Sequence, residues 1–399
     1  MTELYNLKIF CMEHKPKLLF ITSRFPFPLE KGDKLRAYHL IKGLSQHFRI
    51  YLVALSDEPV KEEWLDELKS YTQEIHVFNL SRWGILFRLC RNVFQNWPFQ
   101  LAYFTDFLTQ RRVKKILYAL QPDHIFCQMI RPAEYVKHYH HCRKTLDYMD
   151  LLSVGMERRK GVSKSFKRFI FSMESQRLKE YEQRIFHYFE FHLMISQQDV
   201  NGMPHPQRNH VRVIPNGICT ETFAPVSKRN PTHDLVFVGN LSYAPNIDAI
   251  YWLCENVLQH RKDLTLLIAG ANLGNKLSNY VQRFDNVTML GWQDDIRSVY
   301  LRGKIFIAPM QIGTGLQNKV LEAMALEIPC IVSSLAAAAI PNSPVKVANS
   351  PEEVMAAIDE FLHSDHEAAL VGKEGRNFVK EHYSWHTWTH AINELIRQH

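Results

Sequence analysis

The chain has 399 residues, of which 46% are hydrophobic and 22% are charged. This length predicts two domains, and this composition excludes a wholly disordered chain. A net charge of +7 suits anionic partners such as phosphates or a lipid surface, without selecting among them. The seven cysteines form no CxxC pair and the 20 histidines form no HExxH motif. We therefore expect reduced thiols, no disulfide framework and no metal site.

Short apolar runs alternate with amphipathic stretches along most of the chain. Runs such as LVFV, LTLLIA and IFIA are continuously apolar, which is typical of strands buried on both faces of a parallel sheet. In the first half, strands are predicted at 17–23, 49–55, 74–80, 123–129, 144–150, 191–196 and 211–215. In the second half, they are predicted at 234–239, 264–270, 287–291, 304–309 and 329–333.

Helical periodicity lies between these strands, as at 34–46, 247–259 and 317–326. Strand–helix alternation in both halves predicts the α/β class, with two doubly wound parallel sheets. A ligand bound between two such sheets would lie beyond the carboxyl ends of their strands.

The domain boundary is predicted within 224–232, which is polar and contains two prolines. This places an N-terminal domain at 1–225, a C-terminal domain at 226–380 and a terminal segment at 381–399, with a helix at 383–397. The first 17 residues lack the apolar stretch of a signal peptide, and the longest apolar run, 328–340, is too short to span a bilayer. We expect a cytoplasmic protein that is peripheral to a membrane at most.

The most informative segment is 308–334, APMQIGTGLQNKVLEAMALEIPCIVSS. Gly313 and Gly315 let the backbone approach a ligand, and the following helix offers free N–H groups to an anion. Lys319 lies near that helix N-terminus, where the macrodipole disfavours a cation unless a phosphate is close. Glu322 shares its face and could accept hydrogen bonds from vicinal hydroxyl groups, as on a ribose. The alternative is an ordinary strand–loop–helix with a solvated Lys–Glu pair, because Gly-x-Gly is a weak signal.

Within this segment, KVLEAMALEIPCIVSS resembles the signature helix and strand of the group 1 (family 4) retaining glycosyltransferases. Four more stretches resemble the family in the expected order, namely SRFPFPLEKGDKLRAYHLIKGLS, VRVIPNGICTETFAP, VFVGNLSYAPNIDAI and GWQDDIRSVYLRGKIFIAPM. The resemblance covers the C-terminal half nearly throughout and the N-terminal half in patches. It is closest to sugar transferases associated with exopolysaccharide export systems.

The resemblance implies a GT-B fold, in which two Rossmann-like domains face each other across a cleft. It implies transfer from a nucleotide-diphosphate sugar to a glycan or polyprenyl-linked acceptor, with retention of configuration and without a metal or separate cofactor. In the usual proposal the leaving phosphate takes the acceptor's proton, so no protein base is predicted. The protein's task is then to position the substrates and stabilise the departing diphosphate.

The resemblance also implies which residues bind the donor. Glu322 matches the glutamate that holds the donor ribose, and Lys319 matches a basic position near the diphosphate. Gly32 matches an N-terminal glycine whose amide approaches the leaving phosphate, and 290–294 lie where the nucleobase usually packs. The full predicted donor set is Glu322, Lys319, Gly313, Thr314, Gly315, Gly32, Gly239, Asn240 and Trp292.

The chain departs from the family's pattern at two places. Most members carry a second glutamate where this chain has Thr314, and many carry a basic residue within the stretch that corresponds to 240–246. A threonine hydroxyl can still bind a sugar hydroxyl but carries no charge, which leaves Lys319 as the candidate for the missing cation. Two alternatives therefore stay open: a non-catalytic GT-B protein that binds a glycan or a partner enzyme, and a GT-B sugar-nucleotide epimerase.

Acceptors bind the N-terminal domain in this fold. Asp147 and Asp150 follow a predicted strand and could bind acceptor hydroxyl groups, or they could cap a helix. His39 and His124 are further candidate pocket residues, although a lone histidine is more often structural.

Two basic stretches raise the question of a membrane surface. From Arg158 to Arg168 the chain has six basic residues and no acidic ones, and it continues into FIF. The stretch 82–98 mixes tryptophan, phenylalanine and leucine with three arginines. We expect the first to meet an anionic leaflet and the second to pack on the sheet with its basic face in solvent. No nucleic-acid motif accompanies either stretch, so no nucleic acid is expected.

Overall fold

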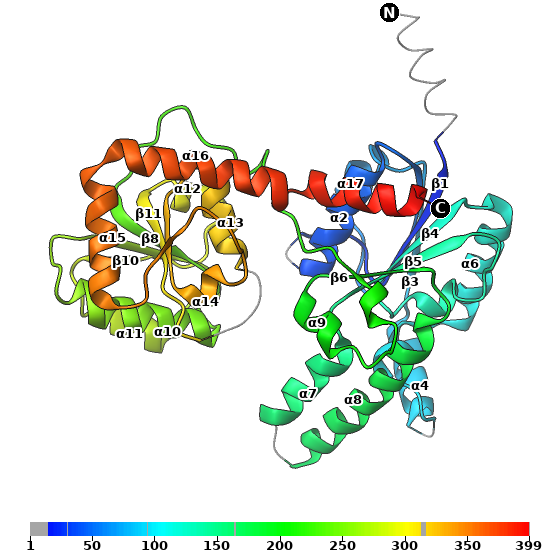
Figure 1. Ribbon diagram of the computed structural model, residues 1–399. Coiled ribbons are helices and arrows are strands. Elements are labelled where there is room, and N and C mark those ends of the chain that lie inside the picture. Colours follow the sequence, from blue (N-terminus) through cyan, green and yellow to red (C-terminus); the bar gives the residue numbers. More distant parts are fainter. Residues whose placement is uncertain (1–14, 30, 94, 163–164, 313–316, 399) are drawn as a thin grey trace, which may run out of the picture. The chain divides into compact units, whose positions relative to one another are not determined.

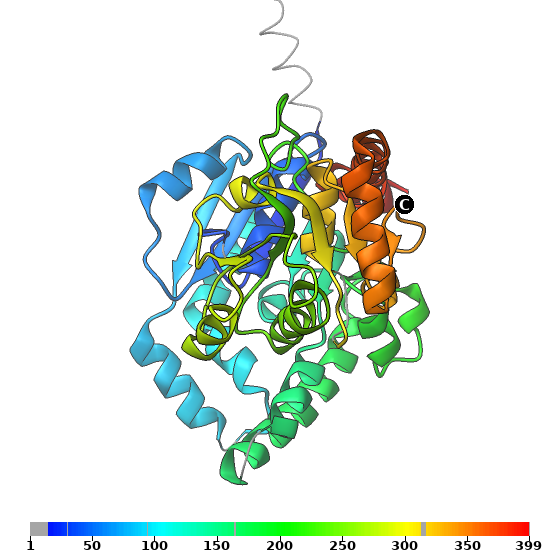
Figure 2. The same cartoon turned by 90° about the vertical axis from the view of Figure 1, so that its left-hand side faces the viewer.

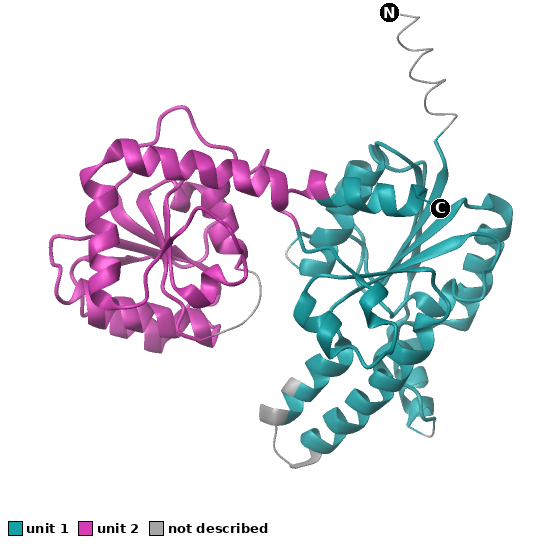
Figure 3. Cartoon of the chain, viewed as in Figure 1, with its two compact units in different colours: residues 1–216, 388–399 teal, residues 217–387 magenta. Residues whose placement is uncertain are grey.

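The computed structural model describes residues 15–29, 31–93, 95–162, 165–312 and 317–398. It divides the chain into two compact units (Figure 3). Unit 1 comprises residues 1–216 and 388–399, and unit 2 comprises residues 217–387. Each unit is built on a parallel sheet with helices on its faces (Figure 1, Figure 2).

Among the described residues, the sheet of unit 1 has seven parallel strands in the order β3-β2-β1-β4-β5-β6-β7. They are β1 (Lys17–Thr22), β2 (Arg49–Ser56), β3 (Glu74–Asn79), β4 (His124–Gln128), β5 (Arg143–Met149), β6 (Phe191–Met194) and β7 (Arg212–Val213). Every residue of β4 is buried, because helices cover both faces of this part of the sheet. The seven strands predicted for the first half are confirmed.

The helices of unit 1 connect these strands. They are α2 (Gly32–Leu44), α3 (Glu62–Lys69), α4 (Arg82–Asn92), α5 (Phe99–Phe104), α6 (Phe107–Leu120), α7 (Leu152–Val162), α8 (Ser165–Phe186), α9 (Gln197–Gly202), and the short helices Ala133–Tyr135 and Arg208–His210. Most of α17 (Trp385–Arg397) also belongs to unit 1. It packs closely on α2 at Gly43, where an added Cβ would lie 2.4 Å from Thr389 Cγ2.

In the described part of unit 2, six parallel strands follow the order β10-β9-β8-β11-β12-β13. They are β8 (His233–Val238), β9 (Leu266–Ala269), β10 (Val287–Met289), β11 (Gly303–Ala308), β12 (Cys330–Val332) and β13 (Lys346–Val347). The first five were predicted and are confirmed. The edge strand β13 was missed, because two partly exposed residues give no apolar run.

The helices of unit 2 include one that changes its geometry part-way. α10 (Ala244–Leu253) continues into a π-helical turn at Cys254–Leu258. The others are α11 (Asn275–Val281), α12 (Ile296–Tyr300), α13 (Asn318–Ala325), α14 (Ser334–Ala337), α15 (Pro351–His363) and α16 (Asp365–His382). Among the helices that the structure describes, none combines the length and apolar character needed to span a bilayer.

Candidate functional site

The predicted donor residues of unit 2 follow three parallel strands at their carboxyl ends. Gly239 and Asn240 follow β8, Trp292 lies beyond β10, and Lys319 and Glu322 lie on α13, which follows β11. Because the strands are parallel, these residues share one edge of the sheet. The fold therefore brings them to the position where doubly wound sheets bind their ligands.

Lys319 lies at the N-terminal end of α13 and is buried, with 9% of its surface exposed. Its ammonium group donates to Asn246 Oδ1, lies 3.3 Å from Met310 Sδ and sits 4.9 Å from the ring centroid of Phe237. No carboxylate of the described residues pairs with it. Burial lowers the pKa of Lys319 to about 8. A buried cation whose neighbours among the described residues are neutral, at the N-terminal end of a helix, forms a site suited to an anion.

Asn246 connects Lys319 to the loop after β8. Its amide nitrogen donates to the backbone oxygen of Asn240 at 2.9 Å. An added Cβ at Gly239 would lie 2.6 Å from that amide nitrogen, so glycine is required there. Gly270, at the end of β9, has a φ of +152°, and its added Cβ would lie 1.7 Å from the Gly239 oxygen. The two glycines let the loops after β8 and β9 meet beside Lys319.

Glu322 lies one turn further along α13 and is only partly exposed. Its Oε2 accepts a 2.7 Å hydrogen bond from the hydroxyl of Tyr300, a fully buried residue of α12. Burial raises the pKa of Glu322 to about 7, and the hydrogen bond from Tyr300 opposes that rise. No described residue donates to Oε1, so this oxygen can accept hydrogen bonds from a ligand.

The remaining residues predicted to bind the donor differ in whether their side chains are available to contact a ligand. Trp292 is 65% exposed, and its Nε1 donates to Asp294 at 3.2 Å, which leaves the faces of its ring open for stacking. The Asn240 side chain is already used, because its Oδ1 accepts from the backbone nitrogen and hydroxyl of Ser242 at 2.9 and 2.8 Å. Gly313, Thr314 and Gly315 lie outside the described residues.

Gly32, the donor candidate of unit 1, is the first residue of α2. An added Cβ there would meet no atom within 4 Å, and no side chain caps this helix N-terminus. The end of α2 is therefore open to an approaching group.

Asp147 does not reach a ligand. Its side chain is fully buried and forms a two-point ion pair with Arg36 of α2, at 2.6 Å (Nε to Oδ2) and 3.2 Å (Nη2 to Oδ1). Arg36 also donates to the backbone oxygen of Pro215 at 3.1 Å and to Asn216 Oδ1 at 3.2 Å. This position contradicts the prediction that Asp147 binds an acceptor and assigns it a structural contact.

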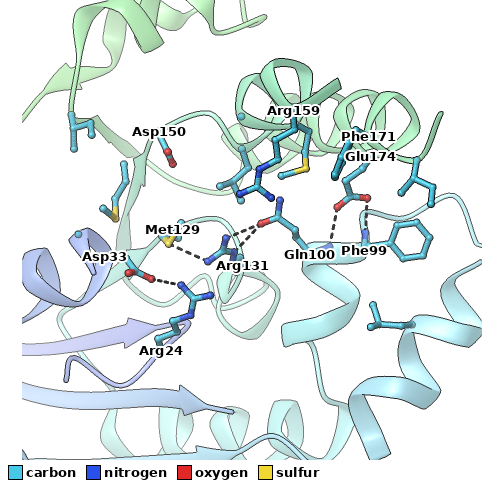
Figure 4. A pocket seen from close by; sticks show the side chains of 18 of the residues that line it. Arg24, Asp33, Phe99, Gln100, Met129, Arg131, Asp150, Arg159, Phe171 and Glu174 are labelled. Atoms are coloured by element: carbon cyan, nitrogen blue, oxygen red, sulfur yellow. Dashed lines mark hydrogen bonds and ion pairs between the residues drawn. The ribbon is translucent and has the colours of Figure 1, made fainter. Parts of the chain in front are cut away.

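Asp150 lines a cavity of about 1010 Å³ in unit 1, together with Gly32. The cavity lies at the carboxyl ends of β1, β4, β5 and β6 and extends between α4, α5, α7 and α8. Three arginines face it, Arg24, Arg131 and Arg159 (Figure 4). The sequence did not predict this cavity, because its walls come from segments that are distant along the chain.

Neither candidate histidine lines the cavity. His124 is buried on β4, where its Nε2 bonds to Thr145 Oγ1 at 2.8 Å and burial lowers its pKa to about 3. His39 lies on α2, with its ring edge-on to Tyr38. The position of His124 is that of a structural histidine. Within the described residues, no group of three or more His, Cys, Asp or Glu side chains could hold a metal ion.

Comparisons with known proteins give a family match for part of unit 2 and a fold match for nearly the whole chain. Residues 232–364 match the family model described as glycosyl transferases group 1, which confirms the group 1 part of the predicted resemblance for that stretch of unit 2. No curated protein sequence matches the chain.

Several solved structures are similar over nearly the whole chain. A sucrose-phosphate synthase from Thermosynechococcus elongatus is 15% identical with a TM-score of 0.63, covering 96% of this chain and 99% of that one. A glycosyltransferase from Rickettsia africae is 11% identical with a TM-score of 0.65, covering 96% and 98%. Anabaena HepE, in complex with UDP and glucose, is 14% identical with a TM-score of 0.61, covering 96% and 99%. At such identities the likeness shows the fold, and the predicted GT-B class with two Rossmann-like domains is confirmed.

Proposed function

We propose that this protein is a group 1, family 4 glycosyltransferase that takes its sugar from a nucleotide-diphosphate sugar bound at Lys319 and Glu322. The observation that carries the proposal is the environment of Lys319, a buried cation without a carboxylate partner among the described residues, inside the segment that matches the family model. The complex of Anabaena HepE with UDP-glucose supports a uridine nucleotide as the first donor to test.

Each donor group has a matching feature in unit 2. The diphosphate would replace the missing counter-ion of Lys319 and use the N–H groups at the start of α13. The ribose hydroxyl groups would donate to the carboxylate of Glu322, and the base would stack on the exposed ring of Trp292. The loop 313–315, outside the described residues, is proposed to face the sugar.

The transfer would need no metal and no protein base. The acceptor oxygen forms a bond to the anomeric carbon while the bond from that carbon to the diphosphate oxygen breaks, and the electron pair leaves with the diphosphate. The proton of the acceptor hydroxyl passes to the departing phosphate on the same face, which retains the configuration. Stabilising that departing charge is the role proposed for Lys319 and for the helix N-terminus at Asn318.

The acceptor is proposed to be a glycan or a polyprenyl-linked sugar, in cell-surface or exopolysaccharide synthesis at the inner face of the cell membrane. Residues Arg159, Lys167 and Arg168 are exposed, and Phe169 beside them is 66% exposed, which supports a membrane role for the basic stretch. The helix α4 packs on the core of unit 1 through Ile85 and Leu89, but several of its other apolar side chains are exposed, which was not expected. Only two of its residues are buried, and Trp83 is 81% exposed.

The nucleotide site is tested by replacing Glu322 with alanine. A nucleotide present at 100 times its dissociation constant stabilises the native state by ~2.7 kcal/mol, which thermal unfolding detects. We expect UDP, or one of GDP, ADP and CMP, to raise the Tm of the wild type. Glu322→Ala should weaken that nucleotide by roughly tenfold or more, because hydrogen bonds to a charged group are lost. Glu374→Ala, which alters an exposed glutamate on α16, is the matched control.

Three other outcomes would redirect the proposal. If no nucleotide shifts the Tm, the donor site as described is wrong and a non-catalytic GT-B protein takes its place. Conversion of the nucleotide sugar in the absence of any acceptor, with a changed hydroxyl configuration, would identify an epimerase. A product with inverted anomeric configuration would overturn the family 4 assignment.

Nucleotide affinity is expected to be highest between pH 7 and pH 8, the interval between the pKa of Glu322 (about 7) and the pKa of Lys319 (about 8). Below this window Glu322 gains a proton and becomes a weaker acceptor, and above it Lys319 loses the charge that attracts the diphosphate. Tyr300→Phe removes the bond that holds down the pKa of Glu322 and should move the acidic limb to higher pH. Calorimetric titration with UDP across this range measures both limbs, and an unmoved acidic limb in the variant would contradict the assignment to Glu322.

A further inference from the structure

We propose that the cavity of unit 1 binds an anionic lipid, with its phosphate or pyrophosphate group at Arg131 and Arg159 and its apolar chain along α4 and α8. The inference rests on the proposed function in one respect, namely that this lipid carries the hydroxyl group that accepts the sugar. The binding itself is a separate property of unit 1.

The cavity has walls that are fixed before any ligand binds. Glu174 of α8 is buried and caps α5, accepting from the backbone nitrogens of Phe99 and Gln100 at 2.8 and 2.9 Å. Arg177 of α8 donates to Asn96 Oδ1 at 3.1 Å. Arg88 of α4 pairs with Asp106 at 2.9 Å. These contacts hold α4, α5 and α8 around the cavity, so little ordering cost is left for binding.

Arg131 provides the centre of the anion site. Its Nε and Nη2 atoms donate to Gln100 Oε1 at 3.2 and 2.8 Å, and its guanidinium lies 5.2 Å from the ring centroid of Phe104. No carboxylate in the described part of the chain lies within ion-pair distance of it. Burial, reinforced by Arg24 and Arg159, lowers the pKa of Arg131 to about 10. Two other cations and a neutral amide therefore surround a partly desolvated guanidinium, which favours a phosphate.

Three acidic residues line the cavity and reduce this positive field, namely Asp33, Asp150 and Glu174, whose carboxylate is already bonded to the backbone nitrogens of Phe99 and Gln100. Asp33 is paired with Arg24 at 3.0 Å, and Asp150 faces the same cavity. In Figure 4, Arg131 and Arg159 lie between these groups on one side and Phe99 and Phe171 on the other.

The far end of the cavity is apolar and open. It is lined by Leu89 and Cys90 from α4, by Val93 directly after that helix, and by Ile170 and Phe171 from α8. Val93 is 61% exposed, and Ile170 and Phe171 are partly exposed. Large apolar side chains that stay in water on two facing helices are stabilised when an apolar molecule covers them.

This combination selects a lipid over the other acceptor classes. A glycan needs many hydrogen-bonding groups, and the walls along α4 and α8 offer few. A neutral lipid would leave Arg131 desolvated without a counter-ion. An anionic lipid suits both ends of the cavity, because its charged group would contact the arginines and its chain would contact the apolar wall. The cavity volume of about 1010 Å³ is sufficient for such a ligand.

The test compares three probes on the full chain by titration calorimetry. These are dodecyl phosphate below its micelle concentration, dodecyl maltoside and inorganic phosphate. We expect dodecyl phosphate to bind at least about tenfold more tightly than either of the others, because only it meets both ends. Equal affinity for dodecyl phosphate and dodecyl maltoside would overturn the anionic lipid and favour a neutral acceptor.

Matched variants locate the site. Arg131→Gln should reduce the affinity for dodecyl phosphate to that for dodecyl maltoside, while Arg131→Lys retains part of the difference and shows that the fold is intact. Val93→Asp should weaken both amphiphiles. Leu108→Asp, on α6 and equally exposed at 62%, should change neither. Unchanged dodecyl phosphate affinity in both Arg131→Gln and Val93→Asp would show that binding occurs elsewhere and overturn the proposal.

The same samples separate this inference from the proposed function. A Tm shift with UDP in a protein that does not bind dodecyl phosphate would overturn the lipid site alone. Binding of dodecyl phosphate in a protein that no nucleotide stabilises would support the lipid site and overturn the donor site.

Discussion

Replacing Lys319 with methionine is expected to stabilise the protein and to abolish nucleotide binding. The pKa of Lys319 is about 8 in the folded chain, against 10.5 for an exposed lysine. That difference corresponds to about 3 kcal/mol by which the protonated side chain destabilises the folded state. Methionine keeps the unbranched shape beside Met310 and Phe237 and carries no charge, so the free energy of unfolding should rise by up to this amount.

The pH dependence of this gain has a definite sign. The folded pKa lies below the unfolded pKa, so the cost is complete below pH 8, where both states hold the proton. Between pH 8 and pH 10.5 the folded state releases its proton first, and the advantage of the methionine variant disappears. Urea unfolding of both proteins at neutral and alkaline pH measures the difference. Lys276→Met, which alters an exposed lysine of α11, is the control and should show no such trend.

The expected loss of nucleotide binding in Lys319→Met explains why a destabilising lysine is present at this position. A chain that retains a destabilising buried cation gains something else from it, and here the gain proposed is binding of the diphosphate. Lys319→Met should therefore lose the Tm shift with nucleotide while starting from a higher Tm. A variant that is less stable than the wild type at pH 7, or that still binds UDP equally well, would contradict this account of Lys319.

The sequence contained most of the information on the sheets. The last four residues of β8 and of β11 are apolar and buried, and such a continuous apolar run is visible in the sequence itself. The edge strand β13 has no such pattern. The exposure of α4 could not be predicted either. A stretch that mixes apolar and basic residues does not reveal whether its apolar face packs on the protein or faces the solvent.

Only those features of the site that lie within one helix could be predicted from the sequence. The positions of Lys319 and Glu322 on one helix follow from their spacing, and the structure places both on α13. The burial of Lys319 without a carboxylate partner among the described residues could not be predicted from the spacing, because its partner Asn246 lies 73 residues away along the chain. The cavity of unit 1 likewise depends on contacts such as Glu174 with Phe99, 75 residues apart. Long-range packing sets which charges lack partners, and no local pattern encodes it.

Replacing Asp147 with alanine is expected to destabilise unit 1 by roughly 3–5 kcal/mol, because it leaves the buried guanidinium of Arg36 without a counter-ion. Both side chains are fully inaccessible to water, so solvent cannot replace the lost carboxylate. Urea unfolding measures the loss, and Asp150→Ala, which alters the exposed neighbour, should cost far less.

A double variant distinguishes the ion pair from simple loss of packing. Arg36→Met combined with Asp147→Leu removes both charges and fills the space with apolar groups, and it should recover much of the stability that Asp147→Ala loses. If Asp147→Ala instead unfolds like the wild type, the pair is not structural.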